Sequence, residues 1–167
     1  MKKVLKAFSI LLMGILLFGC SSDSSVAPVE LVKTKVKIIA WDINSIPLKK
    51  QNGLLWDVIN GPDVISGIVA KSNVLVTFST TINNVTLSLL PIKNTLSSPY
   101  QVSSFNDVID VFVIDDDKND TPSTDNEPIG LVSFTMSDYT TGTNKYPSTV
   151  YKTDGNGTGI TLHLIWE

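Results

Sequence analysis

The sequence predicts an all-β fold, an eight-stranded antiparallel β-sandwich over residues 32–167. The segment "VKTKVKII" alternates, with Val32 and Val36 on one face and lysines on the other, as in a strand with one buried face. Later segments are short, rich in Val, Ile, Thr and Phe, and separated by clusters of Gly, Pro, Asn, Asp and Ser. No segment keeps a helical period. Short strands at this spacing are typical of two packed antiparallel sheets.

Further strands are expected after the first one, each ending at a turn signal. They cover Asp63–Val69, Val74–Ser79, Val85–Leu90, Val108–Ile114, Ile129–Met136 and Gly159–Trp166. The stretch Thr153–Gly159, "TDGNGTG", occurs in one copy without acidic partners nearby. We interpret it as a hairpin turn instead of a calcium loop, because its Asp-Gly and Asn-Gly pairs are typical of tight turns.

The first 19 residues resemble a bacterial lipoprotein signal peptide. A cationic start with Lys2, Lys3 and Lys6 precedes an apolar run that ends at "LFGC", where Cys20 is the only cysteine of the sequence. The run is shorter than the roughly 20 residues of a transmembrane helix. The resemblance implies that Cys20 carries palmitate or similar acyl chains and that residues 20–31 form a flexible tether to the membrane. Because no aspartate directly follows Cys20, the outer membrane is the expected location.

The charged residues argue against a nucleic-acid partner. The chain has 16 acidic and 13 basic residues, and every basic residue is a lysine. Proteins that bind nucleic acid carry clustered basic residues, usually with arginine among them. The predicted membrane attachment therefore comes from the lipid on Cys20 and not from a basic surface.

Acidic side chains in two separated loops predict a metal site. Asp57 and Asp63 flank the turn in "DVINGPD", and Asp115, Asp117 and Glu127 lie in the segment that follows a predicted strand. If the sandwich brings the two loops together, their carboxylates repel each other until a divalent cation neutralises them. Calcium takes six to eight oxygens at roughly 2.3–2.6 Å, and loop carboxylates and carbonyls supply such oxygens. The expected cofactor is therefore Ca²⁺.

The order and spacing of these acids resemble the C2 domain, a calcium- and phospholipid-binding β-sandwich. In that family the first loop carries two aspartates six positions apart, as Asp57 and Asp63 are here. A later loop follows a strand that ends in an alternate pair of aspartates, matched by Asp115 and Asp117. A final acid precedes an apolar residue and a glycine, matched by Glu127 in "EPIG". The resemblance implies that these five acids bind calcium.

The second acidic loop departs from the family pattern. It is longer than usual between Asp117 and Glu127, so Asp120 or Asp125 is an alternative final ligand. Its middle part, "KNDTPST", is polar where members of the family insert apolar side chains into membranes. These departures weaken the expectation of lipid binding more than that of calcium binding.

Nothing in the sequence supports catalysis, and an enzyme is not expected. The one histidine, His163, alternates with Leu162 and Trp166 on the opposite face of a strand, which predicts a surface position. With no second histidine and no cysteine besides Cys20, zinc sites and nucleophile arrangements lack their partners. Asp42 is interpreted as a cap or turn residue at the end of the first strand.

The expected function is that of a lipid-anchored calcium-binding module, which orders or presents a binding surface at the bacterial envelope. Two alternatives stay open. In the first, calcium bridges the domain to a glycan or a phospholipid headgroup. In the second, a metal-free immunoglobulin-like sandwich is a scaffold subunit that contacts another envelope protein.

Overall fold

The computed structural model describes residues 31–50, 52–56, 61–70, 74–117 and 126–167. Residues Lys33–Glu167 form one compact unit that contains all the strands named below. Residues 1–30, which hold the predicted signal peptide and Cys20, lie outside the described residues, as do Asp57, Asp120 and Asp125. Within the described ranges, no helix has the length and apolar character needed to cross a membrane.

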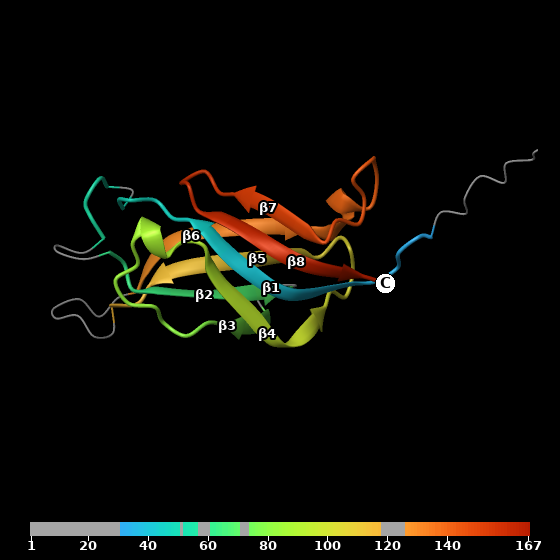
Figure 1. Ribbon diagram of the computed structural model, residues 1–167, viewed down its shortest axis with the longest axis horizontal. Helices are drawn as coiled ribbons and strands as arrows, with labels where there is room; N and C mark the ends of the chain where they lie inside the picture. The colour runs from blue at the N-terminus through green and yellow to red at the C-terminus, as the bar shows by residue number, and fades with distance from the viewer. Residues whose placement is uncertain (1–30, 51, 57–60, 71–73, 118–125) are drawn as a thin grey trace, which may run out of the picture. The chain divides into compact units, whose positions relative to one another are not determined.

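The strands form two four-stranded sheets in which all neighbours are antiparallel. The first sheet has the order β4 (Ile92–Gln101), β1 (Val36–Ser45), β8 (Gly159–Trp166) and β7 (Thr149–Thr153). The second has the order β3 (Val74–Phe78), β2 (Val64–Ala70), β5 (Val108–Asp115) and β6 (Glu127–Thr135). The two sheets pack face to face (Figure 1). The predicted all-β, eight-stranded antiparallel sandwich is confirmed.

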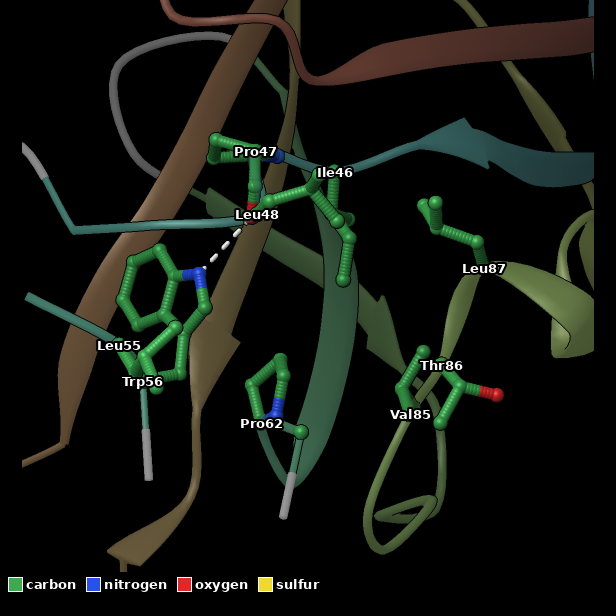
Figure 2. A pocket seen from close by; sticks show the side chains of 10 residues that line it. Ile46, Pro47, Leu48, Leu55, Trp56, Pro62, Val85, Thr86 and Leu87 are labelled. Carbon is green, nitrogen blue, oxygen red and sulfur yellow. Dashed lines mark hydrogen bonds between the residues drawn. The ribbon is translucent and has the colours of Figure 1, made fainter. Parts of the chain in front are cut away.

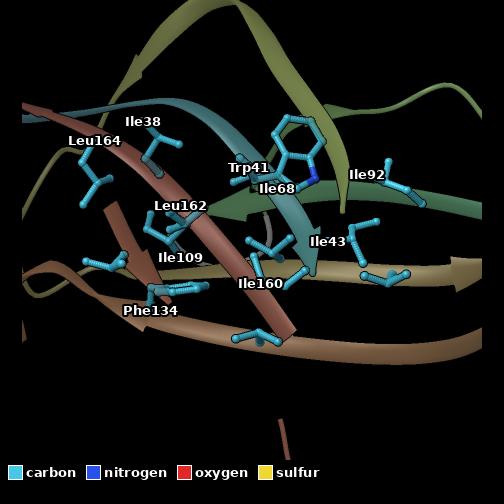
Figure 3. Packing of buried hydrophobic residues seen from close by; sticks show 14 of the residues in the cluster. Ile38, Trp41, Ile43, Ile68, Ile92, Ile109, Phe134, Ile160, Leu162 and Leu164 are labelled. Carbon is cyan, nitrogen blue, oxygen red and sulfur yellow. The ribbon is translucent and has the colours of Figure 1, made fainter. Parts of the chain in front are cut away.

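Alternating side chains fill the space between the sheets. In β5, Ile109 and Val111 point inward and are fully buried, while their neighbours along the strand are more exposed. In β8, Ile160 and Leu162 repeat the pattern from the opposite sheet, and Figure 3 shows the two sets meeting in one cluster. Full burial of such a side chain contributes about 1.5–3 kcal/mol. The alternation seen in the sequence is therefore what assigns each strand its inner face.

Trp41 is the largest of the fully buried side chains among the described residues, and it also joins the sheets by a polar contact. Its ring comes from β1 and is 2% exposed. Its Nε1–H donates to the Oγ atom of Ser66 on β2, at 3.0 Å. The Ser66 backbone N–H in turn donates to Ser79 Oγ at 3.0 Å. The buried indole N–H is thus satisfied, as buried polar groups in proteins generally are.

The predicted strand at Val85–Leu90 is wrong. Val85 is 2% exposed, but Leu87–Leu89 form a short 3₁₀ helix, η1. The segment carries the chain from β3 in one sheet to β4 in the other, so it cannot pair along its length with either sheet. Val85 is its one buried residue, and the Val85 N–H donates to the carbonyl of Pro62, just before β2, at 2.8 Å.

Two strands, β4 and β7, were not predicted. The sequence of β4 contains Pro99, which lacks the N–H of a ladder bond, and it is tolerated because β4 is an edge strand. The pairing of β1 with β4 also shifts register between Ile38 and Ala40. In β1 itself the strand begins at Val36, and the predicted inward residue Val32 is 73% exposed.

The predicted hairpin turn between β7 and β8 is confirmed, since the two strands pair on either side of it. One side chain organises this turn. Asp154 Oδ1 accepts the backbone N–H groups of Asn156 at 2.8 Å and Thr158 at 2.9 Å. Asp154 Oδ2 accepts the N–H of Leu131 on β6 at 3.3 Å, so the turn is also linked to the other sheet.

Asp154→Ala is expected to lower the free energy of unfolding by about 1–3 kcal/mol, because three backbone donors lose a charged acceptor. Urea unfolding followed by circular dichroism measures the loss. Asp107→Ala is the matched control, since Asp107 accepts a single exposed N–H, that of Ser104. Equal losses for the two variants would contradict the role assigned to Asp154.

The acidic residues predicted to bind metal lie at one end of the sandwich. β1 and β5 end there, and β2, β6 and β8 begin there, on the left of Figure 1. We call it the acidic end and define it by Asp63, Asp115, Asp117 and Glu127. At the opposite end, the N–H groups of Thr34 and Lys35 donate to the Glu167 carbonyl at 2.8 and 3.1 Å.

Candidate metal centre

Three carboxylates of the acidic end converge on one point. Asp115 is the last residue of β5 and pairs in register with Glu127, the first residue of β6. Asp117 follows two positions after Asp115. One carboxylate oxygen from each of the three residues lies within 4.8 Å of the other two. We call this group the acidic trio.

The acidic trio is largely shielded from water. Asp115 is fully buried, Asp117 is 6% exposed, and Glu127 is partly exposed. Ionised carboxylates at this separation repel each other by roughly 3–4 kcal/mol per pair at an effective dielectric constant of about 20. Oxygen atoms gathered in this way can hold a metal ion, because a cation replaces the mutual repulsion by attraction.

Asp63 lies beside the acidic trio and contacts it through its backbone. Its N–H donates to Asp115 Oδ1 at 2.7 Å, and its carbonyl accepts the N–H of Asp116 at 2.7 Å. Its own carboxylate accepts the N–H of Asn84 through Oδ1, at 2.7 Å, and is not part of the trio. The first acidic loop therefore meets the second at Asp63, while the predicted ligand Asp57 lies outside the described residues.

Asp116 is a buried acid that the sequence analysis did not single out. It is 7% exposed, and its Oδ2 accepts the hydroxyl proton of Thr81 at 2.7 Å. Asp116 is not one of the three residues whose carboxylate oxygens converge. The run of three aspartates in the sequence is thus divided between two roles.

Lys50 is the second residue that the sequence analysis missed. Its Nζ forms an ion pair with Glu127 Oε2. The hydrogen bond to Glu127 raises the pKa of Lys50, burial opposes this, and the charges of Glu127, Asp115 and Asp117 raise it further. The ammonium group is therefore a counter-ion to Glu127 at the edge of the acidic trio.

A short turn and an indole ring hold Lys50 in place. The Lys50 N–H donates to the Leu54 carbonyl, and the Gly53 N–H donates to the Lys50 carbonyl, both at 2.9 Å. The Lys50 ammonium lies 5.7 Å from the centre of the Trp56 ring, within the range of a cation–π contact. The Trp56 Nε1–H donates to the Pro47 carbonyl at 2.8 Å, which fixes the ring. The doublet Lys49-Lys50 before a glycine turn was the only feature of the sequence that could have pointed to this position of Lys50.

Trp56 also lines an apolar groove of about 320 Å³. Figure 2 shows its lining side chains, which include Ile46, Leu55, Pro62 and Leu87. Leu55 and Leu87 are more than half exposed, at 58% and 57%. Trp56 thus contacts Lys50 and also lines the apolar groove.

The one histidine takes part in a cross-strand contact away from the acidic trio. His163 Nε2 lies 2.9 Å from Asp42 Oδ2, and the His163 side chain is 32% exposed. The interpretation of Asp42 as a cap or turn residue is wrong, because Asp42 lies inside β1 and pairs with Thr161 on β8. The contact between Asp42 and His163 follows from the register of β1 and β8, which the sequence alone does not show.

Comparison with known proteins found no matching family model and no matching curated protein.

Proposed function

We propose that this protein is a lipid-anchored module of the bacterial envelope that binds Ca²⁺ at the acidic end of a C2-like sandwich. The observation that carries the proposal is the convergence of Asp115, Asp117 and Glu127 within 4.8 Å, two of them buried. Asp63 contacts the trio through its backbone N–H, which donates to Asp115 Oδ1, and Asp57 remains a predicted ligand from its sequence spacing. The protein acts by binding and not by catalysis.

The donor set favours calcium over other common metals. All of its groups are carboxylates, and neither histidine nor cysteine lies among the residues of the trio. Zinc prefers those nitrogen and sulfur ligands, and magnesium requires near-ideal octahedral geometry and keeps several waters. Loop carboxylates at strand ends suit the irregular shell of calcium, and extracellular sites with Kd values of about 10⁻⁴–10⁻³ M are common.

Calcium at the acidic end would order or present a binding surface. The chain enters the sandwich at Thr34 and Lys35, which bond Glu167 at the end opposite the acidic trio. The partner is an envelope protein, a glycan or a phospholipid headgroup whose oxygens complete the metal shell.

Asp117→Asn and Glu127→Gln are each expected to weaken calcium binding by about tenfold or more, because each removes a negative ligand without changing the size of the side chain. Isothermal titration with CaCl₂, compared in parallel with MgCl₂, measures the effect. Asp138→Asn and Asp154→Asn are the controls. Asp138 pairs with Lys152 at 3.3 Å, and Asp154 organises the β7–β8 turn. Equal weakening in all four variants would refute the assignment of the site.

The Lys50–Glu127 ion pair favours a second candidate, a metal-free scaffold subunit of an envelope complex. In that case the ammonium permanently takes the place of the metal. The two candidates differ in one measurement. A melting temperature that rises with calcium and falls with a chelator supports the calcium module, whereas a melting temperature unaffected by both supports the scaffold.

A further inference from the structure

We propose that Lys50 is a built-in competitor for the metal, whose ammonium group must leave the acidic trio before calcium binds. The inference rests on the proposed calcium site and adds to it a means of setting its affinity. It also predicts that calcium binding changes the surroundings of Trp56.

The Lys50–Glu127 pair is better shielded than the other lysine–carboxylate pairs that the structure describes. The Lys50 side chain is 22% exposed, compared with 30% for Lys37 and 36% for Lys152 in their pairs. The acid of the pair is also less exposed, at 41% for Glu127. A shielded ammonium interacts more strongly with its neighbours, because less water screens the charge.

The ammonium and a calcium ion would both bind the carboxylate of Glu127. Lys50 Nζ contacts Oε2 of Glu127, a residue of the acidic trio. If Ca²⁺ bound while this contact persisted, the two cations would share a carboxylate and lie roughly 4–5 Å apart, given Ca–O distances of about 2.3–2.6 Å. Like charges this close in a shielded site repel strongly. Since the ammonium stands on a long flexible side chain, it is the group that moves.

Release of Lys50 has a consequence for the neighbouring ring. The Lys50 ammonium lies 5.7 Å from the centre of the Trp56 ring, and the contact is lost when the side chain swings into solvent. Trp56 is 8% exposed and also lines the apolar groove beside Leu55 and Pro62. Calcium occupancy is thereby coupled to the wall of the groove through one side chain.

Lys50→Met tests the competition directly, because methionine keeps the apolar stem and removes the charge. In the full-length protein, purified in a non-ionic detergent and titrated with CaCl₂ by calorimetry, we expect calcium to bind about tenfold or more tightly than in the wild type. Lys50→Gln is a second variant with the same expected direction. Lys49→Met is the matched control, since Lys49 is exposed and belongs to no ion pair among the described residues.

Tryptophan fluorescence gives a readout that a merely supporting role of Lys50 would not move. Calcium should change the emission of the wild type, and Trp56→Phe should remove that change while calcium still binds. In Lys50→Met the calcium-dependent change should be much smaller, because no cation leaves the ring. This pattern together with the gain in affinity supports the proposal.

Two results overturn the proposal in different ways. If calcium binds the wild type and Lys50→Met with equal affinity, or binds the variant more weakly, Lys50 is not a competitor, and the calcium site itself stands. If neither protein binds calcium at up to about 10 mM, well above the range of weak extracellular sites, the proposed function fails and the inference fails with it.

Discussion

Asp115→Ala is expected to abolish measurable calcium binding and also to destabilise the protein, whereas Asp115→Asn is expected to abolish binding alone. Asp115 is fully buried and provides both a ligand of the acidic trio and the acceptor for the Asp63 N–H at 2.7 Å. Loss of a group that merely orients a metal ligand costs about 10–100-fold in affinity, so loss of a ligand itself should cost more. Asparagine keeps an acceptor oxygen for Asp63 but removes the charge.

The two variants of Asp115 are compared in their metal-free state by urea unfolding and in calcium by titration calorimetry. The alanine variant should be less stable than the asparagine variant by about 1–3 kcal/mol, because the Asp63 N–H is left without its acceptor. Calcium affinity close to that of the wild type in Asp115→Asn would remove Asp115 from the ligand set. Equal stability of the two variants would show that the contact with Asp63 does not hold the loops together.

Trp41→Ala is expected to lower the free energy of unfolding by about 3–5 kcal/mol, the range typical of deleting a large buried aromatic side chain. Trp41 is 2% exposed at the centre of the core, and its Nε1–H donates to Ser66 Oγ across the two sheets. Domains are stable by only about 5–15 kcal/mol, so the loss is a large share of the total. The change removes both the packing of one sheet on the other and a buried hydrogen bond.

Chemical denaturation measures this loss, with the slope of the transition checked for a change in the unfolded state. Phe78→Ala is the matched control, because Phe78 is an aromatic residue of the edge strand β3 and is 61% exposed. It should change stability by no more than about 0.5 kcal/mol. A similar loss in the two variants would contradict the central position given to Trp41.

The sequence was sufficient for strands that bury one face, and insufficient for β4 and β7, the two edge strands of the first sheet. Val108–Ile114 was predicted within one residue of β5, because its alternation directly reflects the buried face. β4 was missed because Pro99 and the serines before it resemble a loop, and only the edge position makes the proline acceptable. Val85–Leu90 has strand composition but connects two sheets, and composition does not reveal a crossing.

In the candidate site, separation along the chain decided which residues were predictable from the sequence. Asp115, Asp117 and Glu127 were predicted because they flank strands that are consecutive in the chain, so local pattern and spacing carried the information. Lys50 comes from a turn more than seventy positions before Glu127, and its contact arises only when the two sheets pack. Asp63 was predicted as a ligand, but its backbone contact with Asp115 was not predictable from spacing.

Asp115 pairs directly with Glu127 across two neighbouring strands, so the relative position of these two acids does not depend on the chain that connects them. Ladder bonds between β5 and β6 set the distance between these two carboxylates, and the segment that joins the strands does not have to be of any particular length. Over evolution the part of that connection after Asp117 is free to lengthen, shorten or change composition while the acidic trio is retained. Homologues should therefore differ most between these strands and still share the acids at both borders, a pattern that also marks the connection as the natural place to graft new recognition sequences.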